Sequence, residues 1–270
     1  MKFLKKLSRT VLGGPKLAKG KEGARAYAVG DIHGRLDLLD QLLELLEADI
    51  ASRPQRRNFI VFLGDLIDRG PDSAGVIERL RNWKPPGVRT VFLAGNHEEV
   101  LLRILDGDKG ILPSWLKFGG AECARSYGLD PQELATIAEE DAIAQVQAAV
   151  PPPDREFLAG FGDTFRFGDY LFVHAGLRPG VGIEEQDRFD LRWIREPFLS
   201  DGREHGCVVV HGHTIVDQVE ERPNRVAIDT GAYRTGVLTA VGIEEGERWF
   251  LSTAAQEGDS ATAAPRATTA

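Results

Sequence analysis

Residues 26–34 read AYAVGDIHG, a short apolar run that stops at a glycine and is followed by Asp31 and His33. The pattern recurs at residues 59–70, FIVFLGDLIDRG, and at residues 90–98, TVFLAGNHE. Each run has the length and composition of a buried strand, and each is followed by apolar residues at helical spacing. Repeated strand, loop and helix units predict an α/β fold with parallel strands.

The rest of the chain predicts one folded body over residues 25–252. Residues 106–160 are rich in Ala and Glu, and we interpret them as a helical insertion folded over one edge of the sheet. Residues 253–270 have almost nothing to bury and are expected to be disordered. Six later apolar runs predict a second, more antiparallel sheet: residues 164–167, 170–173, 207–210, 225–228, 236–241 and 248–251.

Composition narrows the class of protein. The 270 residues are 42% hydrophobic and 27% charged, which is typical of a globular protein. The two cysteines, Cys123 and Cys207, are far apart, which excludes a disulfide scaffold and a thiolate zinc site and favours a cytoplasmic location. No apolar run approaches the roughly 18 residues of a membrane span, and the start lacks the apolar segment of a secretory signal.

The charge of the chain is unevenly distributed. The net charge is −8, yet the first 25 residues carry eight basic side chains against one acidic, which leaves −15 on the remainder. An acidic body argues against a nucleic-acid binder. The basic arm, residues 1–24, has helical apolar spacing and could contact an anionic membrane or an acidic partner. A solvated terminus, or a helix docked on its own core, is the alternative.

Side chains of the kind that bind metals follow five of the apolar runs. They are Asp31 and His33; Asp65 and Asp68; Asn96 and His97; His174; and His211 and His213. The loops at the carboxyl ends of strands form the ligand crevice of open α/β sheets, so five of the six histidines are expected to converge. Imidazole with carboxylate suits divalent transition metals, which can activate water against a phosphoryl group. Taken singly, each residue could be a helix cap or an ordinary histidine.

The ordered motifs carry a family resemblance. They are Gly30-Asp-Ile-His-Gly34, Gly64-Asp-Leu-Ile-Asp-Arg-Gly70, Gly95-Asn-His-Glu98, His174-Ala and Gly212-His-Thr214. This series resembles the phosphoprotein phosphatase family of calcineurin-like metallophosphoesterases. Trp115, Gly119-Gly120 and Ser126-Tyr127-Gly128 resemble its bacterial branch, which includes serine/threonine protein phosphatases and symmetrical diadenosine tetraphosphatases. The resemblance implies a four-layer α/β/β/α sandwich with two central mixed sheets and a helical insertion.

The resemblance also implies a dinuclear metal centre. Asp31 and His33 would bind the first metal, and Asp65 would bridge the two metals. The second metal would take the remaining matching residues, which are Asn96, His174 and His213. Manganese is the expected metal, with iron or zinc as alternatives. The implied reaction is direct attack on phosphorus by a hydroxide that bridges the two metals.

Catalytic and substrate-binding roles follow from the same resemblance. His97 matches the histidine that protonates the leaving group, and Asp68 matches the carboxylate that orients it. Arg69 matches an arginine that binds the phosphoryl group, and Asn96 is also expected to contact substrate. A second phosphate-binding arginine is expected in Arg192-Trp-Ile-Arg195, where we favour Arg195 and keep Arg192 as the competitor.

Four further residues are not assigned to the metal centre or to catalysis. His211 would share a strand face with His213, but the family pattern assigns the metal to His213. His205 is expected in a surface loop, and Asp229 is expected to support the site from behind. Cys123 lies outside every motif, and no catalytic role is expected for it.

Three functions remain open at this point. The first is a phosphatase acting on phosphoserine or phosphothreonine in proteins. The second is symmetrical cleavage of dinucleoside tetraphosphates, for which the sequence offers no clear pair of aromatic residues to stack on adenines. The third is a non-catalytic scaffold that retains the metal site, although no ligand residue nor His97 is lost.

Overall fold

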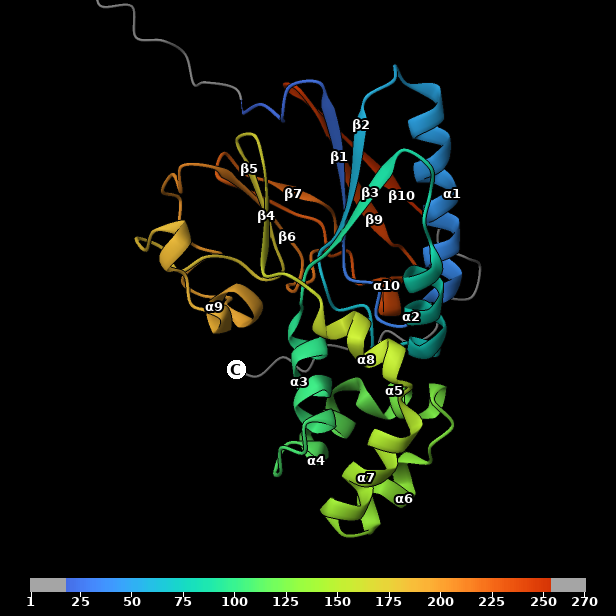
Figure 1. Cartoon of the computed structure of the whole chain (residues 1–270). Coiled ribbons are helices and arrows are strands. Elements are labelled where there is room, and N and C mark those ends of the chain that lie inside the picture. The colour runs from blue at the N-terminus through green and yellow to red at the C-terminus, as the bar shows by residue number, and fades with distance from the viewer. Residues whose placement is uncertain (1–17, 254–270) are drawn as a thin grey trace, which may run out of the picture.

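The computed structural model describes residues 18–253, which form two five-stranded sheets that face each other (Figure 1). The strands are β1 (Ala24–Val29), β2 (Arg57–Phe62), β3 (Val88–Phe92), β4 (Thr164–Phe167), β5 (Tyr170–Val173), β6 (Val208–His211), β7 (Glu220–Glu221), β8 (Arg225–Ala227), β9 (Thr239–Glu244) and β10 (Glu247–Ser252). The longer helices are α1 (Leu36–Ser52), α2 (Ser73–Asn82), α3 (Asn96–Leu105), α7 (Glu139–Ala149) and α8 (Pro152–Ala159). The shorter ones are α4 (Leu112–Trp115), η1 (Leu116–Gly120), α5 (Ala121–Ser126), α6 (Pro131–Thr136), η2 (Ile183–Glu185), α9 (Arg188–Trp193) and α10 (Ala232–Thr235). Most of the predicted basic arm and tail lies outside the described residues.

The first sheet has the strand order β10-β9-β1-β2-β3. Strands β1, β2 and β3 are parallel, as the three repeated motifs predict, and β9 pairs with β1 in the antiparallel sense. Side chains alternate along β1. Ala24, Ala26 and Ala28 face the second sheet, whereas Tyr27 and Val29 face the helices.

The second sheet corrects one sequence prediction. Its order is β4-β5-β6-β8-β7, so it contains four of the six runs assigned to it, joined by the short strand β7. The last two runs instead form β9 and β10 of the first sheet. The second sheet is mixed, because β5, β6 and β8 are parallel while β4 and β7 are antiparallel edge strands. Strand partners depend on contacts distant in sequence, which local composition does not encode.

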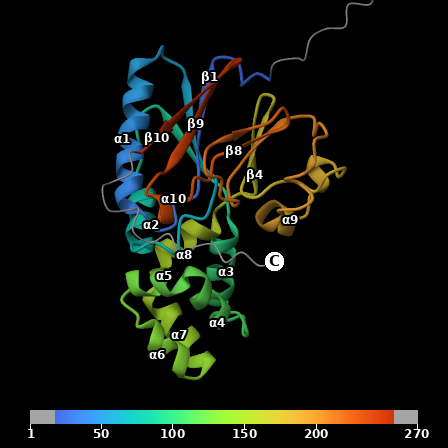
Figure 2. The same cartoon turned by 180° about the vertical axis from the view of Figure 1, so that it is seen from behind.

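The expected four layers are present. Helices α1 and α2 cover the outer face of the first sheet, and α9 lies on the outer side of the second (Figure 2). An apolar layer fills the space between the sheets, where Phe172 and Val210 meet the alanines of β1. Both sheets are therefore held in fixed positions relative to each other, which matters because both supply residues to the site described below.

The helical insertion contains α4 to α8 and lies beyond the carboxyl ends of β1, β2 and β3 (Figure 1). Only its last part covers the sheet edge as predicted. There Phe157 and Phe161 pack on Phe92 of the edge strand β3, at ring-centroid distances of 4.8 and 5.3 Å. Of the other helices, α4 and α7 pack on α3, α5 packs on α2, and α6 packs on α5 and α7. The insertion begins directly after α3, so its helices continue from the end of α3 and do not wrap around the sheet.

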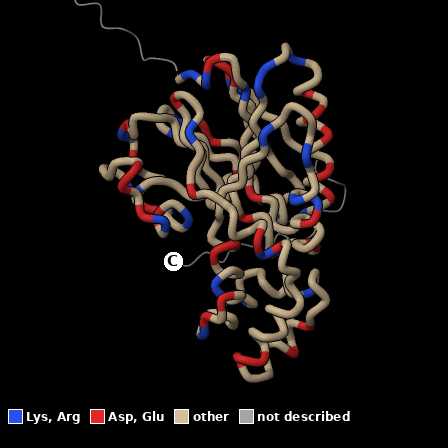
Figure 3. Tube along the Cα trace, viewed as in Figure 1, with Lys and Arg blue, Asp and Glu red and all other residues tan. Residues whose placement is uncertain are grey.

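Charged side chains of both signs are distributed over the surface of the described residues (Figure 3). Among the helices formed by residues 18–253, none combines the length and the hydropathy needed to cross a lipid bilayer.

Candidate metal centre

Main-chain hydrogen bonds tie the loops after four strands together at one end of the two sheets. The amides of Ile32 and His33 donate to the carbonyl of Asp65 at 3.1 and 2.9 Å. The amide of Gly212 donates to the carbonyl of His174 at 2.8 Å. The two sheets are joined by the bond from Nδ1 of His174 to the Leu63 carbonyl at 2.8 Å, so the loops of both sheets converge at the carboxyl ends of their strands.

Two groups of possible metal donors share the carboxylate of Asp65. His33, Asp65 and His97 form one group, and Asp65, His174 and His213 form the other; within each group the candidate donor atoms lie within 4.8 Å of one another. Oδ2 of Asp65 faces Nε2 of His33 at 3.6 Å and Nε2 of His97 at 3.9 Å. Oδ1 faces Nε2 of His174 at 3.4 Å. Each oxygen of one carboxylate thus faces a different donor group, as a ligand bridging two ions would.

The histidine tautomers suit metal binding. Nδ1 of His33 donates to the carbonyl of Ile67 at 2.8 Å, and Nδ1 of His174 donates to the carbonyl of Leu63 at 2.8 Å. Each ring therefore keeps an unprotonated Nε2 that points into the site. Within the described residues, Nε2 of His33 and Nε2 of His213 are buried without a hydrogen-bond partner. Buried polar atoms are rarely left unpaired, so these two nitrogens fit a bound cation.

Asp31 and Asn96 lie beside these groups. The amide of His213 donates to both oxygens of Asp31, at 3.2 and 3.0 Å. Burial raises the pKa of Asp31 well above its usual value, and the nearby carboxylates of Asp229 and Asp65 raise it further. A cation would relieve this concentration of negative charge. Oδ1 of Asn96 lies 3.1 Å from Nε2 of His174, next to the second donor group.

His97 forms a buried pair with Asp68. Nδ1 of His97 and Oδ2 of Asp68 are 2.6 Å apart. Burial lowers the pKa of His97, but the carboxylates of Asp65 and Asp68 outweigh burial and raise it overall. The indole Nε1 of Trp115 donates to both Asp68 oxygens at 3.2 Å. The charged form of the imidazole, whose Nε2 lies 3.9 Å from Asp65, is therefore stabilised by the Asp68 carboxylate, which Trp115 holds in a fixed orientation.

The backbone is strained at these positions. Between residues 18 and 253, six residues other than glycine have a positive φ, and five of them were singled out from the sequence: His33, Asp65, Asp68, Arg69 and His213. Such conformations cost on the order of 1–3 kcal/mol each and cluster at functional sites. The positive φ of 62° at His213 turns the chain at the end of β6, so that this ring joins the donor group.

The three candidate arginines differ in their partners. Arg192 is held in ion pairs with Asp163 at 2.6 Å and Glu99 at 3.2 Å. Among the residues that the structure describes, no carboxylate lies within ion-pair distance of Arg69 or Arg195. Arg195 is exposed and near enough to His213 that its charge helps to lower the pKa of that ring. Arg69 and Arg195 are thus free to bind an anion, whereas Arg192 already has two carboxylate partners.

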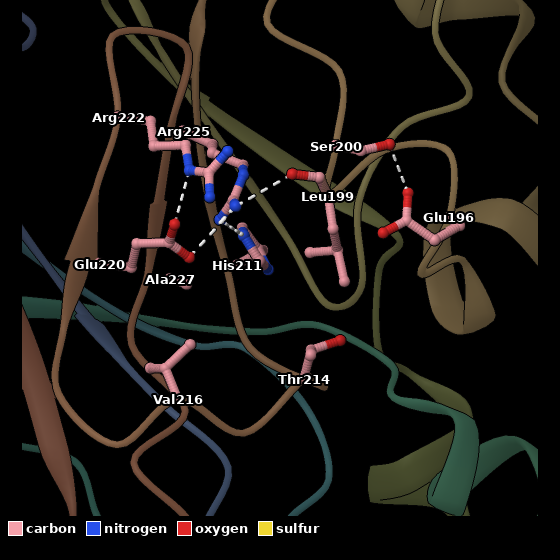
Figure 4. A pocket seen from close by; sticks show the side chains of 10 residues that line it. All are labelled: Glu196, Leu199, Ser200, His211, Thr214, Val216, Glu220, Arg222, Arg225 and Ala227. Atoms are coloured by element: carbon pink, nitrogen blue, oxygen red, sulfur yellow. Dashed lines mark hydrogen bonds and ion pairs between the residues drawn. The ribbon is translucent and has the colours of Figure 1, made fainter. Parts of the chain in front are cut away.

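His211 lies outside the donor groups, in a neighbouring pocket of about 430 Å³ (Figure 4). Its Nδ1 donates to the carbonyl of Gly212 at 3.1 Å, and its Nε2 accepts from Arg225 at 3.4 Å. Both nitrogens are therefore occupied. Burial lowers the pKa of His211 to about 3, so the ring is neutral.

His205, Asp229 and Cys123 lie outside the two donor groups. His205 is half-buried in a loop against Phe198. Asp229 accepts from the amide of Gly231 at 2.9 Å and lies against Asp31, behind the donor groups. Cys123 is buried beside Asp68, and burial raises its pKa well above the usual value, so its thiol is not a poised nucleophile.

Two residues were missed by the sequence reasoning. Glu98 is fully buried and accepts from the amides of Asp65, Leu66 and Gly95 at 2.8, 2.8 and 2.9 Å. It anchors the loop that carries the shared carboxylate, and a Glu three residues after the N-cap residue Gly95 was the available signal. The second residue, Tyr233, places its ring edge-on to His33 at 5.3 Å, and no local pattern indicates that contact.

Comparison with known proteins agrees with this geometry. The family model described as calcineurin-like phosphoesterase matches residues 24–240. The chain is 29% identical to a symmetrical bis(5'-nucleosyl)-tetraphosphatase of Dechloromonas aromatica, over 81% of this chain and 92% of that protein. It is 28% identical to serine/threonine-protein phosphatase 1 of Salmonella typhimurium, over 84% of this chain and 95% of that protein. A crystal structure described as a candidate diadenosine tetraphosphatase shares the fold, with a TM-score of 0.60 at 21% identity over 87% of this chain and 98% of that one.

Proposed function

Because the chain belongs to the calcineurin-like phosphoesterase family, we propose that it is a dinuclear-metal phosphatase that hydrolyses phosphoserine and phosphothreonine in proteins. The observation that carries the metal-dependent phosphatase in this proposal is the shared carboxylate of Asp65, which faces histidines of two donor groups through different oxygens and would serve phosphoprotein and dinucleotide substrates alike. A carboxylate placed in this way suits two cations on one phosphoryl group.

The described donors suit two divalent ions. His33 and Asp65, with Asp31 beside them, would bind the first ion. Asp65 would also bind the second ion, together with His174, His213 and Asn96. Imidazole and carboxylate groups are ligands that divalent transition metals prefer. Ions held there supply an activated water and bind phosphoryl oxygens. Manganese is our first choice for the assay, and iron and zinc suit the same donors.

The acid in the reaction is His97 in this proposal. Its Nδ1 is 2.6 Å from Asp68, so Nε2 is the nitrogen that can deliver a proton to the departing serine or threonine oxygen. Asp68 keeps the imidazole oriented and stabilises its charged form until the proton is transferred. The raised pKa of His97, which Asp65 and Asp68 maintain against burial, suits a proton donor near neutral pH.

Arg69 and Arg195 are assigned to the phosphoryl group. Neither has a carboxylate partner within the described part of the chain, so both guanidinium groups can donate to phosphoryl oxygens. The guanidinium of Arg69 lies 5.0 Å from the ring centroid of Tyr233, which limits the directions in which it can point. Arg192 is expected to position α9 through its two ion pairs rather than to bind substrate.

A second candidate function is symmetrical cleavage of dinucleoside tetraphosphates, as named for the Dechloromonas relative. Exposed aromatic rings near the two free arginines favour it. Phe118, 63% exposed, precedes the glycine whose carbonyl accepts from the Arg69 amide. Phe189, 62% exposed, stacks on Trp193 two residues before Arg195. Rings in such places can stack on bases.

One experiment separates these functions. The purified protein is stripped with a chelator, reloaded with manganese, and assayed in parallel on a phosphoserine peptide and on diadenosine tetraphosphate. We expect turnover of the peptide with little cleavage of the dinucleotide. Release of two ADP from the dinucleotide would instead identify the protein as a symmetrical dinucleoside tetraphosphatase. Turnover of neither substrate, with both metals bound, would indicate a scaffold instead.

A further inference from the structure

One segment of the helical insertion returns to the predicted acid pair. Trp115, at the end of α4, is 4% exposed, and its indole Nε1 lies 3.2 Å from each oxygen of the fully buried Asp68. The other side of that carboxylate faces Nδ1 of His97 at 2.6 Å. The indole proton is thus shared between both oxygens, which fixes the plane of the carboxylate relative to the imidazole.

The glycines that follow Trp115 maintain this placement. A Cβ on Gly120 would lie 2.2 Å from the indole ring of Trp115, so only glycine allows the ring to lie this close to the chain. Gly119 has a φ of +118°, and its carbonyl accepts from the amide of Arg69 at 2.9 Å. A Cβ on Gly119 would lie 2.5 Å from Cγ of Arg69. The segment therefore contacts both members of the Asp68-Arg69 turn.

That turn needs external support. Asp68 and Arg69 have φ values of 71° and 67°, in the left-handed region that side chains other than glycine seldom adopt. Close by in the sequence, the amide of Asp68 donates to Oγ of Ser73 at 2.9 Å, and the amide of Gly70 donates to the carbonyl of Asp68 at 2.7 Å. The insertion adds the contact from Trp115 to the Asp68 carboxylate, beside that of His97, and accepts the hydrogen bond from the Arg69 amide.

We propose that Trp115 is a positioning residue for proton transfer, acting through Asp68 on His97. The insertion is then part of the catalytic apparatus. The inference rests on the proposed function, because it takes His97 as the acid. Loss of an outer partner that orients a metal-binding residue typically costs about 10–100-fold in metal affinity or activity, and we expect a loss of activity of the same order when Trp115 no longer orients Asp68.

The test uses Trp115→Phe, which removes the N–H and keeps an aromatic ring. Metal-loaded protein is assayed on an alkyl substrate, a phosphoserine peptide, and on an aryl substrate, p-nitrophenyl phosphate. The serine alkoxide needs a proton as it departs, whereas nitrophenolate leaves without one. We expect kcat on the peptide to fall at least tenfold and kcat on the aryl ester to fall less than threefold, with KM and metal stoichiometry little changed.

The chain offers a matched control in Trp83→Phe. Trp83 is 7% exposed, and its Nε1 donates to a carboxylate oxygen of Glu47 at 3.1 Å, beyond the end of α2 and outside the donor groups. The control loses the same kind of hydrogen bond at similar burial. We expect it to reduce thermal stability while leaving the ratio of the two kcat values at that of the unmodified protein.

The outcomes discriminate between the inference and the function on which it rests. His97→Asn is assayed beside the two tryptophan variants. If His97→Asn shows the selective loss and Trp115→Phe does not, or loses both activities equally, the positioning role is wrong. If His97→Asn shows no selective loss, the acid assignment itself fails. Should Trp115→Phe not fold, Gly120→Ala, which displaces the ring but keeps its N–H, must show the same selectivity.

Discussion

Glu98 gives the most stringent test of how the candidate site is held in place. Its carboxylate accepts three buried main-chain N–H groups, those of Asp65, Leu66 and Gly95. Two of these belong to the loop that carries the shared carboxylate. We predict that Glu98→Ala lowers both the stability of the metal-free protein and its affinity for metal.

The size of the stability loss follows from two opposing effects. Each buried N–H left without a partner costs about 1–3 kcal/mol. Against this, the variant no longer buries an ionised carboxylate. Burial, with the nearby charge of Asp65, raises the pKa of Glu98 from 4.5 to about 7, which corresponds to about 3 kcal/mol. Taking the middle of the range for three amides, we expect a net loss of about 3 kcal/mol.

Urea unfolding of the metal-free protein at pH 7.5 measures this quantity. Glu99→Ala is the matched control, because Glu99 is the next residue of α3 but is partly exposed and ion-paired with Arg192. Loss of such a pair costs at most about 1 kcal/mol. Manganese titration of the folded variants gives the second readout, in which we expect Glu98→Ala to bind about 10–100-fold more weakly. If Glu98→Ala is no less stable than Glu99→Ala, the three hydrogen bonds do not anchor the loop.

Three further predictions address the reaction and the pH dependence of stability. His97→Asn should reduce turnover of a phosphoserine peptide by at least about 100-fold, the low end for an acid catalyst, while both metals still bind by titration; unchanged turnover would refute the acid role. Arg195→Gln should reduce kcat/KM at least tenfold more than Arg192→Gln, because only Arg192 is held by two carboxylates; the reverse order would exchange their roles. Hydrogen bonds from Tyr27 and Arg53 outweigh burial and lower the pKa of Asp49, so its contribution to stability is present at neutral pH and lost as the pH falls through the lowered pKa. The difference in unfolding free energy between the unmodified protein and Asp49→Asn should therefore shrink between pH 7 and pH 3.

Local sequence was sufficient to predict those strands whose burial depends on the residues next to them in the chain. The runs ending at Val29, Phe62 and Phe92 are strands, because a short apolar run closed by glycine has few other ways to be buried. It failed for the runs that form β9 and β10, whose alternation fits either sheet. Their placement beside β1 is decided by packing: Val241 and Ile243 enter the layer between the sheets, while Ala240 faces the helices.

In the candidate site, too, local sequence predicted which residues come together but not the contacts that each side chain makes. Asp65, His174 and His213 could be predicted to converge, because each lies just after a buried strand. What could not be predicted is how each side chain is engaged. The sequence gives no reason to exclude Arg192 as a phosphate ligand, and its exclusion depends on carboxylates 29 and 93 residues away along the chain. The positive φ at Asp65 and His213 is equally hard to predict, because Asp and His adopt that conformation more often than most residues but still only in a small minority of positions.

The distance between the two sheets is itself part of the site. His33 and Asp65 come from the first sheet, whereas His174 and His213 come from the second, yet Asp65 lies 3.6 Å from His33 and 3.4 Å from His174. The inward face of β1, the central strand of its sheet, consists of fully buried alanines, the smallest side chains that can fill a core. Larger residues there would force the sheets apart, because a packed interior has no room for added methylene groups. Those alanines therefore help to set the spacing that the shared carboxylate requires, although none of them belongs to a donor group.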